Sequence, residues 1–209
     1  MHEKQLGIIL MKFFRKMGFL ILNCSFFISF NQVMAMQEPR DLYDFTHQET
    51  SGVWMIVNDG VMGGISESRL SLDQQGFLVF EGRVSLDYGG GFASVRSILN
   101  RLDADLYDGI LIRFKGDGKR YQLRLRQGDR MDGVAYFRHF ETKIGEWEEV
   151  FLPFHSFQAS YRGRRLPDYP KLDTSRISQL GLMISDKQEG NFRLEVQRIA
   201  LYLNEHFQT

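Results

Sequence analysis

Cysteine is almost absent from this sequence of 209 residues, and its absence limits how the fold is stabilised. The single cysteine, Cys24, lies within the first 35 residues, which we expect to be removed. The remaining chain of about 174 residues would then contain no disulfide and no thiol chemistry. A chain of that length buries enough apolar surface to fold without covalent links. We therefore expect one domain, at 36–209, that is stabilised by its hydrophobic core.

Charge is missing from the stretch Met17–Phe30, which follows a segment with several basic residues. A basic segment, a short apolar run and a small residue at the cleavage position, here Ala35, form the pattern of a secretory signal peptide. We therefore expect residues 1–35 to be a cleaved signal peptide and the domain to be periplasmic or secreted.

Three alternatives to a cleaved signal peptide are less favoured. Lipid attachment at Cys24 requires a small residue before it, and Asn23 stands there. A mitochondrial presequence is amphipathic and rich in arginine, whereas this segment is uniformly apolar. Retention as a membrane anchor is disfavoured because the apolar run is short for a membrane span.

Catalytic and metal-binding patterns are also missing. The histidines beyond residue 35 show no H-x-x-x-H spacing, no G-x-S-x-G motif is present, and Gly116–Lys119 is too short for a phosphate loop. Removing four basic residues and one acidic residue from totals of 26 each leaves 22 and 25, a formal net charge of −3. This balance argues against a nucleic-acid partner. We expect no enzyme activity, no cofactor and no metal site.

Helical periodicity is absent, and strand patterns take its place. Residues 121–126 alternate apolar and polar side chains, so Tyr121, Leu123 and Leu125 are expected in the core. Gly116–Gly118 predicts a hairpin turn between two strands. The expected strands are 77–86, 92–98, 110–115, 121–126, 134–142, 148–152, 177–185 and 192–203. The pattern is typical of an all-β sandwich or jelly roll with one long irregular stretch at 156–175.

Glycine gathers in two turn motifs. Asn58–Ser68 contains Asn-Asp-Gly and Gly-Gly, and Gly89–Gly91 leads directly into a strand-like run. These motifs are either two hairpin turns or places where the backbone packs closely against a neighbour or a ligand. We also expect Asp59 and Arg96, one from each motif, to form a buried ion pair.

These motifs resemble the signature of the CIA30 family, which is named for complex I intermediate-associated protein 30. The residues that carry this part of the resemblance are Trp54, Asn58, Asp59, Gly60, Met62, Gly63, Gly64, Gly90, Gly91, Phe92 and Arg96. Later motifs follow in the family's order, at Gly116–Tyr121, Trp147, Leu152–Phe154, Tyr161–Arg164, Ile184–Lys187 and Gly190–Leu194. The resemblance covers essentially the whole chain beyond residue 35, and we expect Trp54 and Trp147 in the core.

The resemblance implies a galactose-binding-like β-sandwich (jelly roll). It also implies a role in assembly, since the best-known member of the family is a mitochondrial chaperone for respiratory complex I. A plant chloroplast relative is associated with messenger RNA. An exported protein would not meet the matrix-side or cytoplasmic arm of complex I, so the expected signal peptide argues against that particular role here.

Polar and aromatic side chains on the expected strands 121–126 and 134–142 form a candidate binding face. Arginine offers planar donors to carboxylate, phosphate or sugar, and tyrosine offers a stacking surface. The alternative is a solvated outer face with cross-strand ion pairs. A basic cluster in the irregular stretch is either a contact site or a solvated loop. The candidate binding residues are Arg124, Arg126, Tyr136, Arg138, His139, Arg162 and Arg164.

The sequence therefore predicts a non-catalytic binding or assembly-factor module, and a carbohydrate-binding module is the alternative. We expect an unidentified protein partner, with a membrane-associated protein and a glycan among the candidates. A groove that exposes Tyr136, Phe137 or Tyr161 would favour carbohydrate, because sugars stack on aromatic rings.

Overall fold

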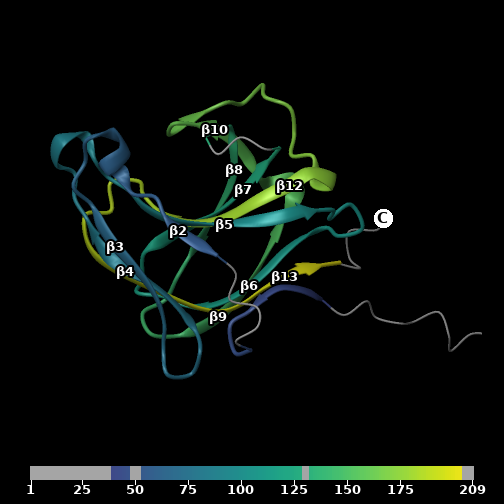
Figure 1. Ribbon diagram of the computed structural model, residues 1–209, viewed down its shortest axis with the longest axis horizontal. Coiled ribbons are helices and arrows are strands. Elements are labelled where there is room, and N and C mark those ends of the chain that lie inside the picture. Colours follow the sequence, from purple (N-terminus) through teal and green to yellow (C-terminus); the bar gives the residue numbers. More distant parts are fainter. Residues whose placement is uncertain (1–38, 48–52, 129–131, 204–209) are drawn as a thin grey trace, which may run out of the picture. The chain divides into compact units, whose positions relative to one another are not determined.

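The computed structural model describes residues 39–47, 53–128 and 132–203, which form a sandwich of two antiparallel β-sheets (Figure 1). The first sheet has the strand order β3-β4-β13-β6-β9, and β1 also pairs with β13. The second sheet has the order β11-β10-β8-β7-β12-β5-β2.

The first sheet contains β1 (Arg40–Asp44), β3 (Glu67–Leu72), β4 (Leu78–Val84), β6 (Gly109–Lys115), β9 (Trp147–Pro153) and β13 (Gly190–Tyr202). The second contains β2 (Trp54–Ile56), β5 (Ala93–Leu102), β7 (Arg120–Gln127), β8 (Ala135–Glu141), β10 (Gln158–Tyr161), β11 (Arg164–Arg165) and β12 (Ile177–Ile184). Short 3-10 turns lie between strands: η2 (Asp59–Met62), η3 (Asp87–Gly89), η4 (Phe154–Ser156) and η5 (Thr174–Arg176).

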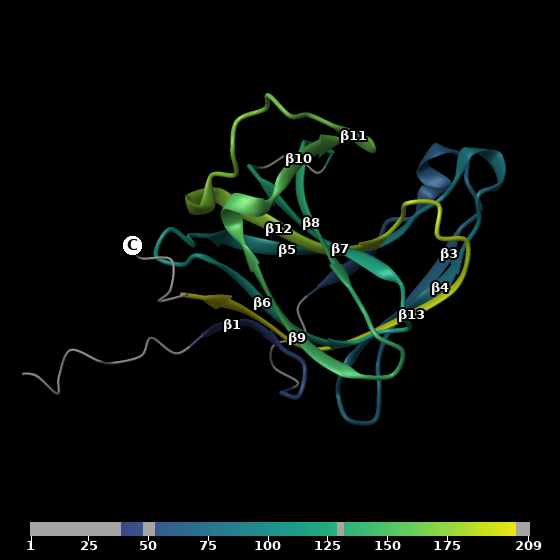
Figure 2. The ribbon, with the colours of Figure 1, turned by 180° about the vertical axis from the view of Figure 1, so that it is seen from behind.

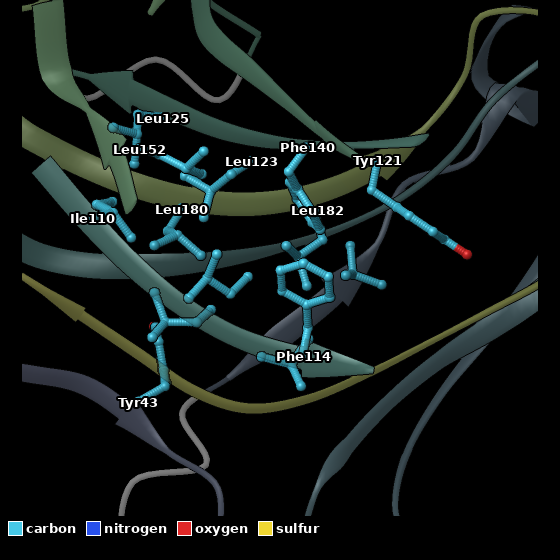
Figure 3. Close-up of a cluster of buried hydrophobic side chains, with 14 of the residues drawn as sticks. Tyr43, Ile110, Phe114, Tyr121, Leu123, Leu125, Phe140, Leu152, Leu180 and Leu182 are labelled. Carbon is cyan, nitrogen blue, oxygen red and sulfur yellow. The ribbon is translucent and has the colours of Figure 1, made fainter. Parts of the chain in front are cut away.

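The core lies between the sheets and is built from alternate residues of their strands (Figure 3). Tyr121, Leu123 and Leu125 of β7 are fully buried, as the alternation predicts. They share one core cluster with side chains of the first sheet, and Phe114 of β6 meets Phe140 of β8 across it, with ring centres 4.8 Å apart. The opposite residues of β7 therefore point to the outer face of the second sheet.

The turn at Gly116–Gly118 is a crossing between sheets, so the predicted hairpin is wrong. β6 pairs with β13 and β9, whereas β7 pairs with β12 and β8. A hairpin and a crossing use the same turn residues. The difference lies in which distant strand each segment pairs with.

The long irregular stretch contains a small hairpin, β10–β11, that extends the second sheet beyond β8 (Figure 2). The hydroxyl of Tyr136 donates to the carbonyl oxygen of Pro170 at 3.0 Å and so ties the rest of this stretch to the sheet.

The prediction of an all-β sandwich is confirmed. The expected signal peptide and its cleavage site lie outside the described residues, and the boundaries 1–35 and 36–209 stay a prediction. Within the described ranges, no helix is long and apolar enough to cross a membrane.

Candidate functional site

The two glycine motifs are joined by the buried carboxylate of Asp59, which is 1% exposed. Its Oδ1 accepts from the backbone N–H of Ser66 at 2.9 Å, and its Oδ2 accepts from the Ser66 hydroxyl at 2.5 Å. The backbone N–H groups of Gly91 and Phe92 donate to the same Oδ2 at 2.7 and 3.2 Å. These partners stand in place of the expected ion pair with Arg96. Burial acts to raise the pKa of Asp59, but these hydrogen bonds outweigh it and lower the pKa.

The glycines are required by close packing around this carboxylate. A Cβ at Gly64 would lie 2.5 Å from Cγ of Asp59, and a Cβ at Gly90 would lie 2.6 Å from its Oδ2. Gly63 has a φ of 93°, a backbone conformation that residues with a Cβ rarely adopt, so glycine is favoured there by its conformational freedom. The motifs are therefore places of close backbone approach to a neighbouring part of the same chain. The side-chain oxygen of Asn58 adds to the junction by accepting from Ser68 and Ser94.

Three arginines lie on the outer face of the second sheet. Gly181 of β12 is in register with Arg96 of β5 on one side and Arg124 of β7 on the other. Neighbouring strands are about 4.8 Å apart, so the two arginine Cα atoms are about 10 Å apart. A Cβ at position 181 would lie 2.7 Å from the carbonyl oxygen of Val95, and its absence leaves the space between the arginines open. Arg126 is two positions from Arg124 and shares its face.

Arg124 is held by neutral groups. Its Nη1 donates to Oε1 of Gln122 at 2.7 Å, and its Nη2 donates to Oγ of Ser160 at 3.4 Å. Its guanidinium carbon lies 5.9 Å from the ring centre of Phe137, and that of Arg165 lies 5.7 Å from the same ring. The charge of Arg124 is thus fixed in position by partners that do not neutralise it.

Burial lowers the pKa values of all three arginines, and repulsion from neighbouring arginines lowers those of Arg124 and Arg126 further. Burial, followed by the charge of Arg96, lowers the pKa of Arg124 to about 10. Burial and the charges of Arg96 and Arg124 lower the pKa of Arg126 to about 10, although Asp132 acts in the opposite direction. Burial also lowers the pKa of Arg96. All three stay protonated at neutral pH, so an anion placed among them would be stabilised.

Two adjoining cavities of about 500 and about 290 Å³ lie over these arginines. We call them together the arginine groove. The residues that line both cavities are Phe92, Arg124, Ser160, Gly163 and Met183. The β10–β11 hairpin borders the groove on one side, and the loops with the glycine motifs border it on the other (Figures 1 and 2).

The turn η2 adds an apolar lip to the groove, formed by Val61 and Met62. These side chains are 74% and 59% exposed and line the larger cavity. Their turn begins at the buried Asp59, so the junction described above fixes the position of the lip.

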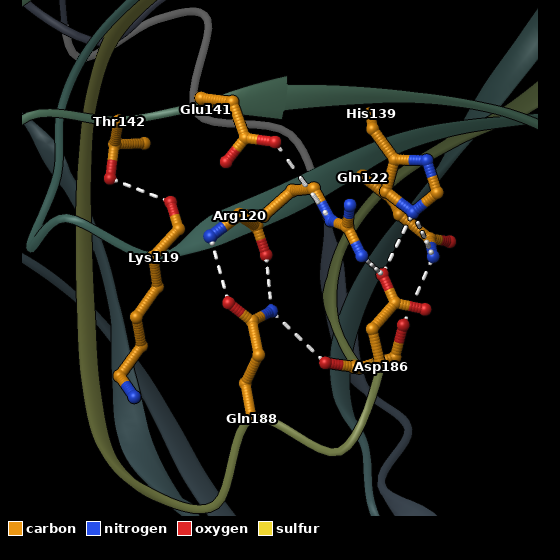
Figure 4. A network of polar contacts seen from close by, with 9 residues as sticks. Lys119, Arg120, Gln122, His139, Glu141, Thr142, Asp186 and Gln188 are labelled. Carbon is orange, nitrogen blue, oxygen red and sulfur yellow. Dashed lines mark hydrogen bonds and ion pairs between the residues drawn. The ribbon is translucent and has the colours of Figure 1, made fainter.

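The far end of the groove carries a polar network (Figure 4). Nε2 of His139 lies 2.9 Å from Oδ2 of Asp186, and Nη2 of Arg120 lies 3.1 Å from the same oxygen. Gln188 exchanges hydrogen bonds with the backbone of Arg120 at 2.9 and 2.7 Å. Asp186 has a φ of 62°, outside the usual range for a residue with a side chain.

The candidate binding residues divide between different surfaces. Arg124, Arg126 and His139 line the groove, as does Arg162. Tyr136 is buried in the core. Arg138 is on the same face of β8 as Tyr136, opposite the face toward the groove, and its side chain is exposed. Arg164 is exposed on β11.

Two residues that line both cavities of the groove, Ser160 and Met183, were not identified from the sequence. Strand register decides which of them meet the arginines, and a single sequence does not reveal register. Trp54 packs against Tyr43 and Phe45 at the core, as expected. Trp147 instead lies half-buried on the outer face of the first sheet, against Phe77.

A cavity of about 620 Å³ beside β3, β4 and β13 is a weaker candidate. The charges at its centre are already paired, since Glu81 forms ion pairs with both Arg69 and Arg193 at 2.7 and 2.5 Å. In the described part of the chain, no group of three or more acidic, histidine or cysteine side chains is arranged to hold a metal ion.

The fold and this face together define a galactose-binding-like β-sandwich with a charged groove on one sheet. A family model described as Complex I intermediate-associated protein 30 (CIA30) matches residues 43–196. The chain therefore belongs to the CIA30 family, and the resemblance predicted from its motifs is confirmed.

Two curated relatives illustrate the family. The mouse mitochondrial complex I intermediate-associated protein 30 is 25% identical over 197 residues, which cover 82% of this chain and 58% of the relative. A probable mitochondrial counterpart from Caenorhabditis elegans is 28% identical and covers 79% of this chain and 54% of the relative. The chain thus spans about half the length of the curated relatives it matches.

Solved structures support the fold. A family 11 carbohydrate-binding module from Clostridium thermocellum, in complex with a β-1,3-1,4-mixed-linked tetrasaccharide, aligns with a TM-score of 0.60 and 18% identity. The alignment covers 80% of this chain and 98% of the module. An agarase aligns with a TM-score of 0.53 and 12% identity over 80% of this chain and 25% of its own. At these identities the likeness shows the fold alone.

The expected periplasmic or secreted location is contradicted by the relatives. Those from mouse, Caenorhabditis elegans and Drosophila melanogaster are named as mitochondrial proteins. The expectation rested on the apolar run Met17–Phe30, which lies outside the described residues. Hydrophobicity alone does not specify the membrane to which a segment is directed, and this accounts for the error.

Proposed function

We propose that this chain is a non-catalytic assembly-factor module that binds a protein intermediate of respiratory complex I. Membership of the CIA30 family is the observation that carries the proposal, because the relatives are named for association with complex I intermediates. A secretory location no longer argues against this role.

The arginine groove is the contact surface that the geometry favours for this role. Arg124 and Arg126 keep their charge at neutral pH, since their lowered pKa values remain near 10. They therefore supply charge and hydrogen bonds and are poor donors or acceptors of a proton. Such a surface suits binding better than catalysis.

Affinity capture of the tagged full chain from its own cells tests the proposal. The wild type is compared with Arg124→Gln in the groove and Arg113→Gln on the exposed outer face of the first sheet. We expect complex I subunits to be enriched with the wild type and with Arg113→Gln and to be lost with Arg124→Gln. Recovery of no complex I subunit by the wild type would refute the assembly role. Equal recovery by all three would place the contact elsewhere.

Carbohydrate binding is the second candidate, and the observation in its favour is Tyr161. Its side chain is 39% exposed and lines the larger cavity of the groove. Tyr136 and Phe137 are buried, so they offer no open stacking platform. Affinity electrophoresis in gels with β-1,3-1,4-glucan tests this function. Retardation that Tyr161→Ala abolishes would support it.

A further inference from the structure

The arginine groove has the features of a site for one particular class of ligand. We propose that it binds an extended acidic segment of a partner protein, with a carboxylate held by Arg124 and Arg126 and an apolar side chain against Val61 and Met62. The proposal rests on the proposed function, because it names the ligand of the same site.

The arginines match a carboxylate in geometry. A guanidinium carries five N–H donors in a plane, and a carboxylate accepts two parallel hydrogen bonds from such a fork. Arg124 uses one donor on Gln122 and one on Ser160, which leaves others for a ligand. The neutral partners position the guanidinium without neutralising it, so the attraction for an anion is retained.

The acidic groups in the groove favour a ligand of low charge. Asp132 lines the larger cavity near Arg126, and Asp186 lines the smaller cavity beside His139. Asp132 repels negative charge at its end of the groove, whereas Asp186 is already paired with Arg120 and His139. A single carboxylate at Arg124 avoids the repulsion from Asp132, whereas a polyphosphate or nucleic-acid strand, with charge along its length, would meet it.

The apolar lip explains why the ligand is a peptide segment. Exposed Val61 and Met62 offer contact area to an aliphatic side chain, and a methionine adapts to different shapes. They line the same cavity as Arg96 and Arg126. A ligand that contacts both surfaces needs an acidic and an apolar group close together, as neighbouring side chains of a peptide provide.

The dimensions of the groove suit a short extended segment. Arg96, Arg124 and Phe137 line the groove and are in register on β5, β7 and β8, with Gly181 of β12 between the two arginines. Three inter-strand spacings give a length of about 14 Å, which an extended chain covers with about four residues. Side chains two positions apart face the same way in such a segment, so glutamate and leucine at that spacing would both face the groove.

Fluorescence anisotropy with the full chain tests the ligand class. The probe is a labelled eight-residue peptide with glutamate and leucine two positions apart, compared with peptides that carry glutamine or lysine in place of glutamate. We expect the acidic peptide to bind roughly 10- to 100-fold more tightly than the glutamine peptide, as loss of a charge-assisted contact predicts. The lysine peptide should not bind, and added salt should lower the affinity for the acidic peptide.

Matched variants locate the site. Arg124→Gln should reduce the affinity roughly tenfold or more, and Arg124→Lys should restore it only in part, because lysine keeps the charge and lacks the fork. Met62→Ser should lower the affinity for the acidic peptide severalfold. Arg113→Gln and Leu106→Ser, which change exposed residues outside the groove, should leave the affinity unchanged.

Three outcomes would overturn the proposal: equal binding of the acidic and glutamine peptides, equal loss with Arg113→Gln, or binding of the β-1,3-1,4-linked tetrasaccharide that excludes the peptide. Inorganic phosphate that displaces the peptide at equal concentration would also overturn it and would indicate a phosphate site. These results are distinct from failure of the proposed function. If complex I subunits co-purify in a way that depends on Arg124 but the acidic peptide does not bind, the assembly role would be supported. An acidic segment would then be excluded as the ligand of the groove.

Discussion

At the scale of single residues, the carboxylate of Asp59 joins two motifs that lie about 30 positions apart in the sequence. A buried carboxylate that accepts several N–H groups is favourable only while every donor keeps its acceptor. Removal of the Asp59 carboxylate takes this acceptor away from the backbone N–H groups of Ser66, Gly91 and Phe92. The presence of Asp59 and of the glycines packed around it in the family's signature is thus explained by folding.

Asp59→Ala should therefore lower the free energy of unfolding by about 2 to 4 kcal/mol, which is the range for breaking a buried charged hydrogen-bond network. Urea unfolding followed by circular dichroism measures the change. Asp87→Ala, which alters an exposed aspartate in the neighbouring turn η3, is the control and should change the stability by less than about 0.5 kcal/mol. Equal stability of the two variants would show that the junction is dispensable.

The same carboxylate predicts a dependence on pH. Burial acts to raise the pKa of Asp59, but its hydrogen bonds hold the pKa below the ordinary value. A lowered folded-state pKa means that the stabilisation is complete above the ordinary value, about 4, and is lost as pH falls through the lower folded-state value. The stability difference between wild type and Asp59→Asn should be constant from about pH 8 to pH 5 and should shrink below about pH 4. A difference that stays constant in acid would contradict this account.

At the scale of elements, the turn between β12 and β13 stores backbone strain. Asp186 and Lys187 have φ values of 62° and 59°, a region that side chains disfavour. Asp186 is compensated by its contacts with His139 and Arg120. Lys187 is exposed and lines the same end of the groove.

Lys187→Gly should consequently raise the free energy of unfolding by about 0.5 to 1 kcal/mol, because glycine adopts positive φ without strain. Asp186→Gly should lower it, since the loss of two ion-pair partners outweighs the relief of strain. Chemical denaturation of both variants tests the contrast. Changes of the same sign in both would show that backbone strain does not distinguish these positions.

Elements also show how far sequence reasoning extends. Alternation along β7 correctly predicts that Leu123 and Leu125 face the core while Arg124 and Arg126 face outward. Successive side chains of a strand point to opposite faces, so the apolar residues mark the buried face. The same rule places Arg138 opposite Leu123 and away from the groove. The crossing at Gly116–Gly118 was beyond local reasoning, since it depends on pairing with strands far along the chain. The partners of Asp59 were hidden for a related reason: three are backbone N–H groups, which side-chain identities do not reveal.

At the scale of the whole molecule, the seven-stranded sheet buries the charge of Arg124 close to the charge of Arg96, and this arrangement opposes folding. Burial and repulsion lower the pKa of Arg124, so protonation of this side chain is less favourable in the folded chain than in the unfolded one. For a base with a lowered folded-state pKa, the destabilisation is present at neutral pH and would diminish only as pH rises through about 10. A residue that destabilises the empty fold and faces a cavity is expected to serve binding.

Arg124→Met should therefore raise the free energy of unfolding at pH 7 by about 1 to 3 kcal/mol while it removes binding, because methionine keeps the packing against Phe137 and deletes the buried charge. Arg113→Met is the matched control, since this arginine is exposed on the other sheet, and its stability should lie within about 0.5 kcal/mol of the wild type. Thermal and urea unfolding of the three proteins, each with and without the acidic peptide, measures both effects. The peptide should raise the melting temperature of the wild type and of Arg113→Met and leave that of Arg124→Met unchanged.

An Arg124→Met variant that is less stable than the wild type would contradict this account. It would mean that the hydrogen bonds of Arg124 to Gln122 and Ser160 contribute more to stability than the buried charge costs. Arg124 would then be a structural residue that connects β7 and β10.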